Sequence, residues 1–262
     1  MALDKKTEII LNECRDLEKV LNNDILSQFA KLHNINEENN MFKLKQELLA
    51  RSAYFLNVKK KYVLYITNKE GVPTSEIYCR GIEIRRSDWP QMTKDGMSKI
   101  LDLLVKEEKV SFKNIRELIT STRSEIMKLI INRSKEIAKP VSFSKTLSEY
   151  KQIPSHVLGM LLWNDLEYEY FVPGTKGYQF KIKGINFDLA PEKIKTKSRI
   201  ITRKNNNIVV PFEESSLPNY YVLNSDEMCN LIWDSVIEKL LEPIWGKIDK
   251  STRFKELCFE EI

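Results

Sequence analysis

The chain has 262 residues, of which 42% are hydrophobic and 30% charged, and its formal net charge at pH 7 is +5. This length is enough to bury one large core or two small ones. There is no apolar run long enough to cross a bilayer, and the polar stretch Met1 to Thr7 does not resemble a secretory signal, so we expect a cytoplasmic protein with no membrane partner. The modest positive charge permits nucleic-acid binding but does not require it.

The cysteine and glycine patterns exclude several kinds of site. The four cysteines are far apart and form no CxxC pair, and the chain has only two histidines, so a zinc site is not expected. A reducing compartment is the default setting for such cysteines. The eight glycines form neither a GxGxxG fingerprint nor a Walker loop, which excludes those two nucleotide cradles.

The chain begins with a predicted helix. Between residues 4 and 32 apolar residues recur every three or four positions and share one face: Ile10, Cys14, Leu17, Leu21, Ile25, Phe29 and Leu32. The polar stretch 34–40 interrupts this pattern. Residues 41–51 then form a second apolar-periodic or extended segment, and residues 52–56 predict a strand.

A basic hairpin follows, and the rest of the chain is interpreted around it. Lys59-Lys60-Lys61-Tyr62 leads into a run of β-branched and aromatic residues, 68–71 supplies turn residues, and 76–84 predicts a second strand. Along a strand, Lys60 and Tyr62 share one face while Lys59 and Lys61 share the other. Lysines followed by a tyrosine can bridge phosphates while the ring packs against sugar or protein. The alternative is a strand start decorated with solvated lysines, and spacing alone favours it.

Helices and short strands are predicted for the remainder. The first is a helix capped by Ser87 or Asp88 with Pro90 in its first turn, and the second is a helix from about 113 to 138 that Pro140 ends. An irregular segment 141–150, a helix 153–164 and strands 178–182 and 208–210 follow. The last is a helix from about 226 that Pro243 kinks or ends.

Three further groups of residues are candidates for chemistry. A basic cluster forms either a phosphate track on an extended segment or a solvated loop: Lys193, Lys195, Lys197, Arg199, Arg203 and Lys204. Asp165, Glu167 and Glu169 alternate and would share one strand face, so they are the best internal candidates for a metal pair, although no histidine accompanies them. His156 is expected to be structural, because no serine or cysteine nucleophile is visible beside it.

Several of these segments resemble family B DNA polymerases, most closely the phage enzymes. Lys59-Lys60-Lys61-Tyr62 resembles the KKxY motif of that family. Gly81 to Ile84, Arg86-Ser87 and Pro90 resemble the segment that leads from this motif into the thumb. Further segments of similar order are the Pro-His-Gly block 153–164, the prolines of 208–218 and the closing helix 238–244.

The resemblance implies an α+β fold. Residues 1–86 are expected to be the C-terminal part of the palm with the KKxY hairpin, and 87–249 a mainly helical thumb with a small β-containing insertion. The tail 250–262 carries three apolar residues, Phe254, Leu257 and Phe259. It is interpreted either as a peptide that inserts these residues into a sliding clamp or as a frayed end or docked terminal turn. By the same resemblance Lys59, Lys60 and Tyr62 face the primer–template duplex, Lys61 takes the variable position, and Arg86 is a further candidate for a phosphate contact.

The catalytic motifs of the family do not occur in this sequence. Neither DxxSLYP nor DTDS, whose carboxylates hold two magnesium ions, is present, and the nucleotide-binding helix with its NSxYG pattern is also missing. We therefore expect no catalytic residue, no cofactor and no metal bound by this chain. Magnesium is expected in the active site of a partner, an N-terminal polymerase subunit with the catalytic palm.

The resulting interpretation is a C-terminal subunit of a split, phage-type polymerase, which is inactive alone and works in the host cytoplasm if phage-encoded. A second interpretation is a repurposed thumb that binds DNA or a clamp without any catalytic role. A third is a metal-dependent nuclease that uses Asp165, Glu167 and Glu169.

Overall fold

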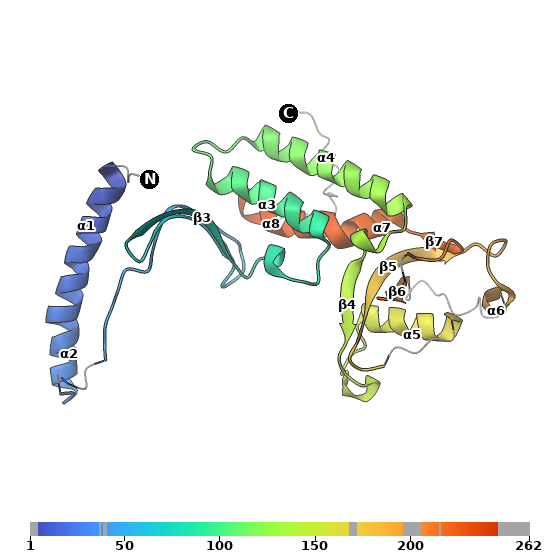
Figure 1. Ribbon diagram of the computed structural model, residues 1–262, viewed down its shortest axis with the longest axis horizontal. Helices are drawn as coiled ribbons and strands as arrows, with labels where there is room; N and C mark the ends of the chain where they lie inside the picture. The colour runs from blue at the N-terminus through green and yellow to red at the C-terminus, as the bar shows by residue number, and fades with distance from the viewer. Residues whose placement is uncertain are drawn as a thin grey trace. The chain divides into compact units, whose positions relative to one another are not determined.

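The computed structural model describes residues 5–36, 38, 41–167, 172–195, 206–214 and 216–245. They form two compact units, the first from the described residues up to Phe55 together with Tyr62–Arg80, and the second from Leu56–Lys61 together with the described residues from Gly81 onward. Both units combine helices with antiparallel sheets (Figure 1). No helix within the described ranges has the length and apolar character that crossing a membrane requires.

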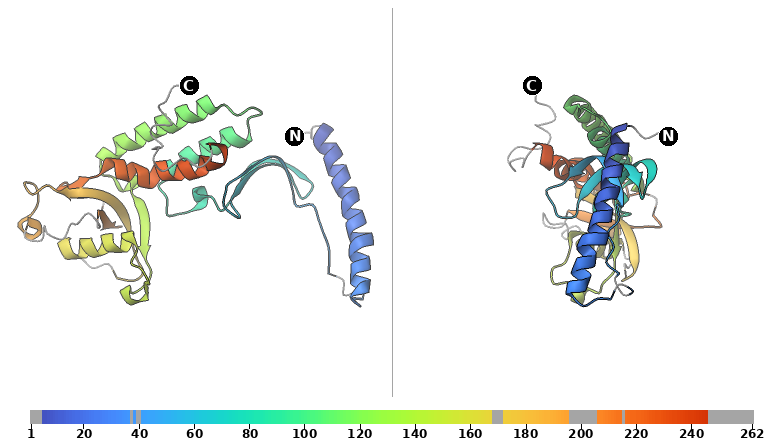
Figure 2. Two further views of the ribbon diagram at one scale, coloured as in Figure 1. Left: turned by 180° about the vertical axis from the view of Figure 1, so that it is seen from behind. Right: turned by 90° about the vertical axis from the view of Figure 1, so that its left-hand side faces the viewer.

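A long helical rod opens the first unit, as predicted for residues 4–32. It consists of α1 (Lys5–Val20), a π-helical turn (Leu21–Leu26) and α2 (Ser27–Leu32) without interruption (Figure 2). The Ser27 hydroxyl donates to the Asn22 carbonyl five residues earlier at 3.2 Å, which suits the wider π-helical turn. Leu11 and Ala30 are buried, but several large apolar side chains remain exposed: Ile9, Leu17, Val20, Ile25, Phe29 and Leu32.

The sheet of the first unit has three antiparallel strands in the order β1 (Leu48–Phe55), β2 (Tyr62–Lys69), β3 (Val72–Arg80). The predicted turn is confirmed, since the Asn68 side chain accepts a hydrogen bond from the Gly71 N–H at 3.0 Å and Gly71 has φ +87°. The second strand was predicted at 76–84, which is wrong at both ends. The turn leads directly into Val72, and Gly81, at φ +71°, turns the chain out of the sheet.

The second unit contains a helical layer, in which α3, α4 and α8 lie side by side in Figure 1 and in the left-hand view of Figure 2. Its elements are a 3₁₀ turn (Glu83–Arg85), α3 (Gln91–Val105), α4 (Phe112–Ile131), α7 (Ser225–Cys229), a π-helical turn (Asn230–Asp234) and α8 (Ser235–Trp245). Pro243 lies inside α8, which continues to Trp245, the last described residue.

Two predicted helix ends in this layer are wrong. Neither Ser87 nor Asp88 caps α3: Pro90 occupies the cap position, and the Asp88 carboxylate is bound by Arg86 instead. The predicted helix 113–138 ends at Ile131, because Arg133 adopts φ +57° and turns the chain before Pro140 is reached.

The second layer of this unit is a sheet of β4 (Lys139–Phe143), β5 (Thr175–Ile185), β6 (Asn207–Pro211) and the short β7 (Tyr221–Leu223). β5 pairs antiparallel with the other three strands, and α5 (Ser155–Glu167) packs against β6. The prediction that 141–150 is irregular is wrong for Val141 to Phe143. Pro140 is tolerated in β4 because this strand lies at the edge of the sheet.

Buried polar contacts fix the π-helical turn before α8. The Arg123 guanidinium of α4 binds the Asp234 carboxylate with N–O distances of 2.9 and 3.3 Å, and 6% of the Asp234 side chain is exposed. The Thr93 hydroxyl of α3 donates to the Ile232 carbonyl at 2.8 Å. The aromatic ring of Trp233 lies so close to Gly96 that a Cβ there would be 2.5 Å from it. One short turn therefore ties together three helices.

Replacing Asp234 by alanine is expected to lower the free energy of unfolding by about 3–5 kcal/mol, because it leaves the Arg123 charge partly buried without its partner. Asp102→Ala is the matched control. It removes an ion pair of 3.1 Å whose side chains are about half exposed, and is expected to cost about 0–1 kcal/mol. Urea unfolding measures both, and equal losses would show that the Arg123–Asp234 pair does not stabilise this layer.

Candidate nucleic-acid interface

Lys59 and Lys60 lie at the tip of a tight turn between β1 and β2. The Lys61 N–H donates to the Val58 carbonyl at 3.2 Å, and the Leu56 N–H donates to the Lys61 carbonyl at 3.1 Å. Lys60 adopts φ +64°, and both tip lysines are exposed. The prediction that the lysines alternate along a strand is therefore wrong, because the strand begins only at Tyr62 and the lysines before it follow a turn.

The backbone at Gly81 lies against the lysine turn. A Cβ at Gly81 would be 2.7 Å from the Lys60 carbonyl oxygen and 3.0 Å from the Lys61 Cγ, and the residue has φ +71°. Both the space and the backbone angle therefore require glycine. The turn is held against a fixed piece of backbone.

Lys61 differs from its two neighbours. Its ammonium is 2.9 Å from the Glu83 carboxylate, and both side chains are largely shielded from solvent. Within the described part of the chain no ion pair is formed by Lys59 or Lys60. The turn therefore carries one lysine that anchors it and two that project into solvent.

Tyr62 belongs to β2 in the first unit and is half-buried. Its ring lies 6.0 Å from the ring of Phe55 and 6.3 Å from that of Tyr78, centroid to centroid. It pairs in register with Arg80 of β3, and a hydrogen bond with the Tyr62 side chain raises the pKa of the exposed Arg80 guanidinium. Sequence reasoning missed Arg80; its pairing with Tyr62 depends on the strand register.

Arg86 lies just after the 3₁₀ turn and is already paired. Its Nε and a terminal nitrogen donate to the two oxygens of Asp88 at 2.8 and 2.6 Å, and these bonds raise the pKa of Arg86. Burial opposes ionisation of Asp88, but the hydrogen bonds and charge of Arg86 lower the pKa of its carboxyl overall. A phosphate bound by Arg86 would share the guanidinium with Asp88.

The basic cluster of residues 193–204 does not form an extended edge where it is described. Lys193 and Lys195 lie in a single helical turn, α6 (Glu192–Lys195). Lys193 pairs with Glu167 at 3.1 Å and Lys195 with Glu192 at 2.8 Å. The other four members lie outside the described residues: Lys197, Arg199, Arg203 and Lys204.

Asp165 and Glu167 do not form a metal pair, and the third acidic candidate, Glu169, lies outside the described residues. Asp165 and Glu167 belong to α5 rather than to a strand, so residues two apart point in different directions. The Glu167 carboxylate accepts hydrogen bonds from Tyr220 and Tyr221 at 2.5 and 2.6 Å, in addition to the Lys193 ion pair. Burial, followed by these bonds, raises the pKa of both tyrosines. Glu167 thus has a structural role.

The remaining candidates are metal-ligating clusters, His156 and the three apolar residues of the tail. In the described ranges, no three histidine, cysteine, aspartate or glutamate side chains gather closely enough to hold a metal ion. His156 lies in the first turn of α5, where burial and then the charge of Lys139 lower its pKa. The clamp-binding candidates Phe254, Leu257 and Phe259 lie outside the described residues.

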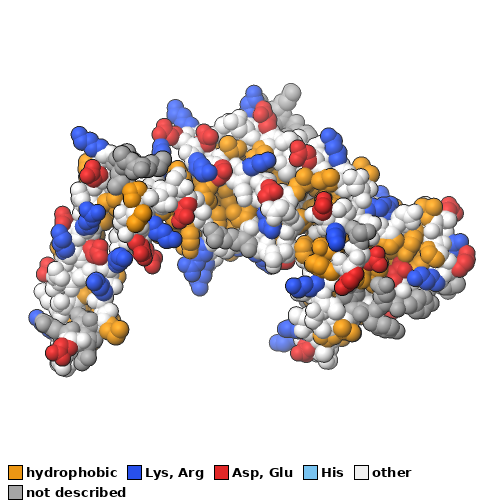
Figure 3. Space-filling model, in the orientation of Figure 1, with side chains coloured by type: hydrophobic (Ala, Val, Ile, Leu, Met, Phe, Trp, Pro, Cys, Tyr) orange, Lys and Arg blue, Asp and Glu red, His pale blue; other side chains and the backbone are white. Residues whose placement is uncertain are grey.

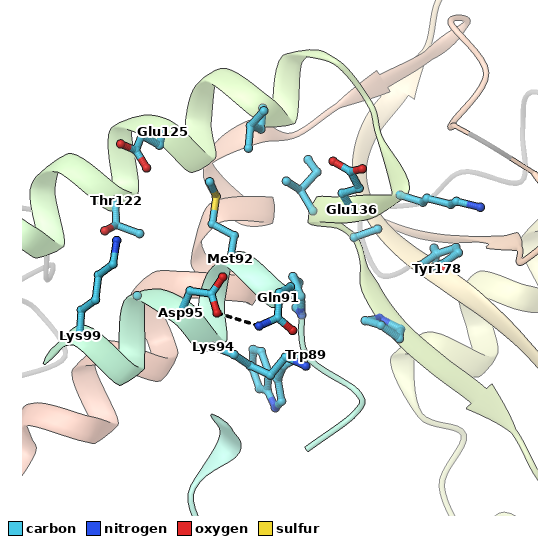
Figure 4. A pocket seen from close by; sticks show the side chains of 17 residues that line it. Trp89, Gln91, Met92, Lys94, Asp95, Lys99, Thr122, Glu125, Glu136 and Tyr178 are labelled. Atoms are coloured by element: carbon cyan, nitrogen blue, oxygen red, sulfur yellow. Dashed lines mark hydrogen bonds between the residues drawn. The ribbon is translucent and has the colours of Figure 1, made fainter. Parts of the chain in front are cut away.

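A cavity of about 690 Å³ lies in the second unit between α3, α4 and the start of β4 (Figure 4). Trp89 and Tyr178 provide aromatic walls, and Gln91 donates to Asp95 at 2.7 Å within it. Its charged lining is balanced, with three lysines and three carboxylates: Lys94, Lys99, Lys135, Asp95, Glu125 and Glu136. The cavity therefore does not select an anion.

Charges of both signs are interspersed over the face of the molecule drawn in Figure 3. No single broad basic patch identifies a binding surface there. The candidate interface of the second unit therefore depends on local groups, namely the Lys59–Lys61 turn, the Gly81 and Glu83 residues that hold it, and Arg86.

Gly81→Ala is expected to destabilise the second unit by about 1–2 kcal/mol for the left-handed backbone and about 1–3 kcal/mol more for the overlap with Lys60. Gly174→Ala is the matched control, since Gly174 has φ +96° but nothing within 4 Å of its Cβ position. It should show the backbone cost alone in urea unfolding. A loss at Gly81 no larger than that at Gly174 would mean that the turn is not held by this close approach.

The sequence was compared with models of known protein families. A family model described as DNA polymerase family B matches residues 12–164, more than half of the 262 residues. The matched range includes the Lys59–Lys61 turn, Gly81, Glu83, Arg86 and most of α5.

Curated relatives match a shorter stretch. The DNA polymerase of Thermococcus aggregans is 32% identical over 108 residues, which are 39% of this chain and 5% of that protein. DNA polymerases of Pyrococcus horikoshii and Pyrococcus glycovorans are 33% and 34% identical over 108 residues, which are 8% and 12% of their lengths. The match therefore covers a small fraction of each relative.

A solved structure is also similar. The family B DNA polymerase of Pyrobaculum calidifontis aligns with 88% of this chain and 25% of its own, at a TM-score of 0.48 and 16% sequence identity.

Proposed function

This chain belongs to DNA polymerase family B, and from that premise we propose that it holds primer–template DNA during DNA replication, as the C-terminal subunit of a split, phage-type polymerase. In this proposal residues 1–86 complete the palm and 87–249 form the thumb. The chain grips the duplex through its backbone, without regard to sequence, and keeps the primer 3′ end near a catalytic site on another chain.

The turn at Lys59 and Lys60 is the observation that carries this proposal. Two exposed lysines without an ion pair among the described residues stand at the tip, while the Lys61–Glu83 pair and Gly81 fix the turn beneath them. An ordered turn loses little conformational freedom when its lysines meet phosphates. Tyr62 is proposed to support the duplex from β2, and Arg86 to add a phosphate contact.

The catalytic carboxylates are proposed to belong to a partner chain. The DxxSLYP and DTDS motifs that would hold two magnesium ions are not in this sequence. Glu167, one of the alternative acids, is bound by two tyrosines and a lysine. The partner is proposed to be the N-terminal polymerase subunit, which would supply the metal ions that activate the primer hydroxyl.

The exposed apolar side chains of the α1–α2 rod are proposed to face that partner. Leu17 and Leu32 expose 58% and 81% of their surface, and four other large apolar residues of the rod are similarly uncovered. Contiguous exposed apolar surface is typical of protein interfaces. For the tail, we retain the proposal that Phe254, Leu257 and Phe259 bind a sliding clamp.

Replacing Lys59 and Lys60 together by alanine is expected to weaken duplex binding and to reduce the slope of log K against log[salt] by about 1.8, since each lost phosphate contact removes about 0.9. Fluorescence anisotropy with a labelled primer–template between 50 and 200 mM salt measures this slope. The double variant Lys109→Ala/Lys128→Ala, at two exposed lysines of the second unit, should leave it unchanged. An unchanged slope for the Lys59/Lys60 variant would mean that these lysines are solvated and do not contact DNA.

Mixing the chain with a polymerase fragment that carries the missing carboxylate motifs is expected to restore magnesium-dependent primer extension, whereas neither chain extends the primer alone. The Lys59→Ala/Lys60→Ala variant should restore less extension at 200 mM salt. If DNA binding is present but no stoichiometry restores extension, the chain is a DNA-binding protein of this family without a polymerase partner, and the split-subunit proposal is wrong.

A further inference from the structure

Lys139 is a cation that the comparison with polymerase motifs did not single out. It is the first residue of β4, an edge strand of the sheet in the second unit, and it is half-buried. Its neighbours Ala138 and Pro140 line the cavity shown in Figure 4, whereas Lys139 does not. Because successive side chains of a strand alternate between faces, Lys139 points away from that cavity.

The aromatic ring of Trp89 supports this lysine. The Lys139 Nζ lies 4.5 Å from the centroid of the Trp89 ring, the geometry of a cation–π contact. Trp89 directly follows Asp88 in the chain. Lys139 therefore lies beside the segment that runs on from Glu83, the residue that anchors the Lys59–Lys61 turn. The ring covers one side of the ammonium group and keeps water from it.

The charges around Lys139 do not balance. Glu83 and Asp88 are the nearby carboxylates, and each is already bound, Glu83 by Lys61 at 2.9 Å and Asp88 by both arms of Arg86 at 2.6 and 2.8 Å. Among the described residues Lys139 itself forms no ion pair. Burial lowers its pKa, the two carboxylates oppose this effect, and the charges of Arg86 and Lys239 add to it.

This group of side chains therefore has a positive excess. Four cations, Lys61, Arg86, Lys139 and Lys239, face two carboxylates. Lys61 and Arg86 are bound by these carboxylates, whereas neither Lys139 nor Lys239 forms an ion pair among the described residues; of these two, Lys239 is exposed and Lys139 is half-buried. A shielded and unneutralised ammonium group gains more from a bound anion than a fully hydrated one, because less water must be displaced. The imidazole of His156 is close enough to feel the Lys139 charge.

We propose that Lys139, seated on Trp89 and flanked by Arg86 and Lys239, binds a phosphate group. The ligand class is a phosphate mono- or diester, supplied by the duplex backbone or by a free phosphate. For the backbone source the inference rests on the proposed function and extends its contact surface beyond the Lys59–Lys61 turn. Arg86 and Asp88 form its border, since an incoming phosphate can take over the Arg86 donors that Asp88 now occupies.

The first experiment compares duplex binding by Lys139→Met and Lys139→Arg. Methionine retains an unbranched apolar side chain that packs on Trp89 but removes the charge, and it should reduce the slope of log K against log[salt] by about 0.9. Arginine keeps the charge and should preserve the slope. Lys183→Met is the matched control, an exposed lysine of β5 in the same sheet, and should leave the slope unchanged. Circular dichroism confirms that each variant is folded.

The second experiment uses inorganic phosphate and does not depend on DNA. The chain has two histidines, so the imidazole proton signals of His156 and His33 can be followed separately by NMR during pH titrations. Phosphate bound at Lys139 should raise the pKa of His156, because an anion offsets the Lys139 charge and stabilises the imidazolium. His33, in the first unit, is the internal reference. In the Lys139→Met variant, phosphate should no longer raise the pKa of His156.

The outcomes separate this site from the proposed function. A reduced salt slope for Lys139→Met supports a contact with the duplex backbone. A His156 shift with phosphate but an unchanged slope supports a site for free phosphate only. If neither quantity changes while Lys59→Ala/Lys60→Ala still weakens duplex binding, the Lys139 site is wrong and the proposed function stands. If the wild-type chain binds no DNA, the phosphate titration alone decides the Lys139 site.

Discussion

The close approach of Gly81 to the carbonyl of Lys60 is the constraint on which the candidate interface depends. A side chain at position 81 would overlap the turn, and the backbone angle of Gly81 turns the chain out of the three-stranded sheet at the same point. The residues immediately beyond it include Glu83, which binds Lys61. One glycine therefore ends β3, seats the lysine turn and places the carboxylate that anchors it.

The roles of neighbouring cations are distinguished by their partners. Lys61 and Arg86 are each bound by a carboxylate, so they order the backbone around them. Lys59 and Lys60 remain exposed, which suits a contact with mobile, solvated phosphates, whereas Lys139 is shielded by Trp89. Either kind releases counterions from DNA when it neutralises a phosphate, and a shielded cation adds a stronger local attraction. Both kinds are linked to Glu83 of the 3₁₀ turn, which binds Lys61 beside the two exposed lysines and whose charge acts on Lys139.

Sequence periodicity predicted much of the fold. The helix 4–32, the turn at Asn68 and the helix ending near Asn164 follow from apolar spacing and from turn residues, which are local properties. The errors occur where strand register, a side-chain contact or a backbone angle overrides the pattern of residue types. The register of β2 excludes the lysines from the strand, Arg86 takes Asp88 away from the helix cap, and Arg133 ends α4 before Pro140.

The candidate site was predicted in part for the same reason. The family motifs identified Lys59, Lys60 and Arg86 as candidates for contacts with DNA, but they could not show which of these cations are bound by a carboxylate of the same chain. Glu167 remained a candidate for a metal pair in the sequence because the two tyrosines that bind it lie more than fifty residues later in the chain. Lys139 carried no sequence signal at all, since its contact with Trp89 joins two residues that are far apart in the chain.

Photo-cross-linking from the tip of the lysine turn tests most directly whether this turn contacts DNA. A photoreactive residue at position 60 would be irradiated in the presence of primer–template duplexes of different sequence, and the cross-linked nucleotides mapped. We expect cross-links to the duplex near the primer 3′ end in every sequence, and few from the same residue placed at position 109. Equal cross-linking from both positions, or none from position 60, would contradict a role of the turn in holding the duplex.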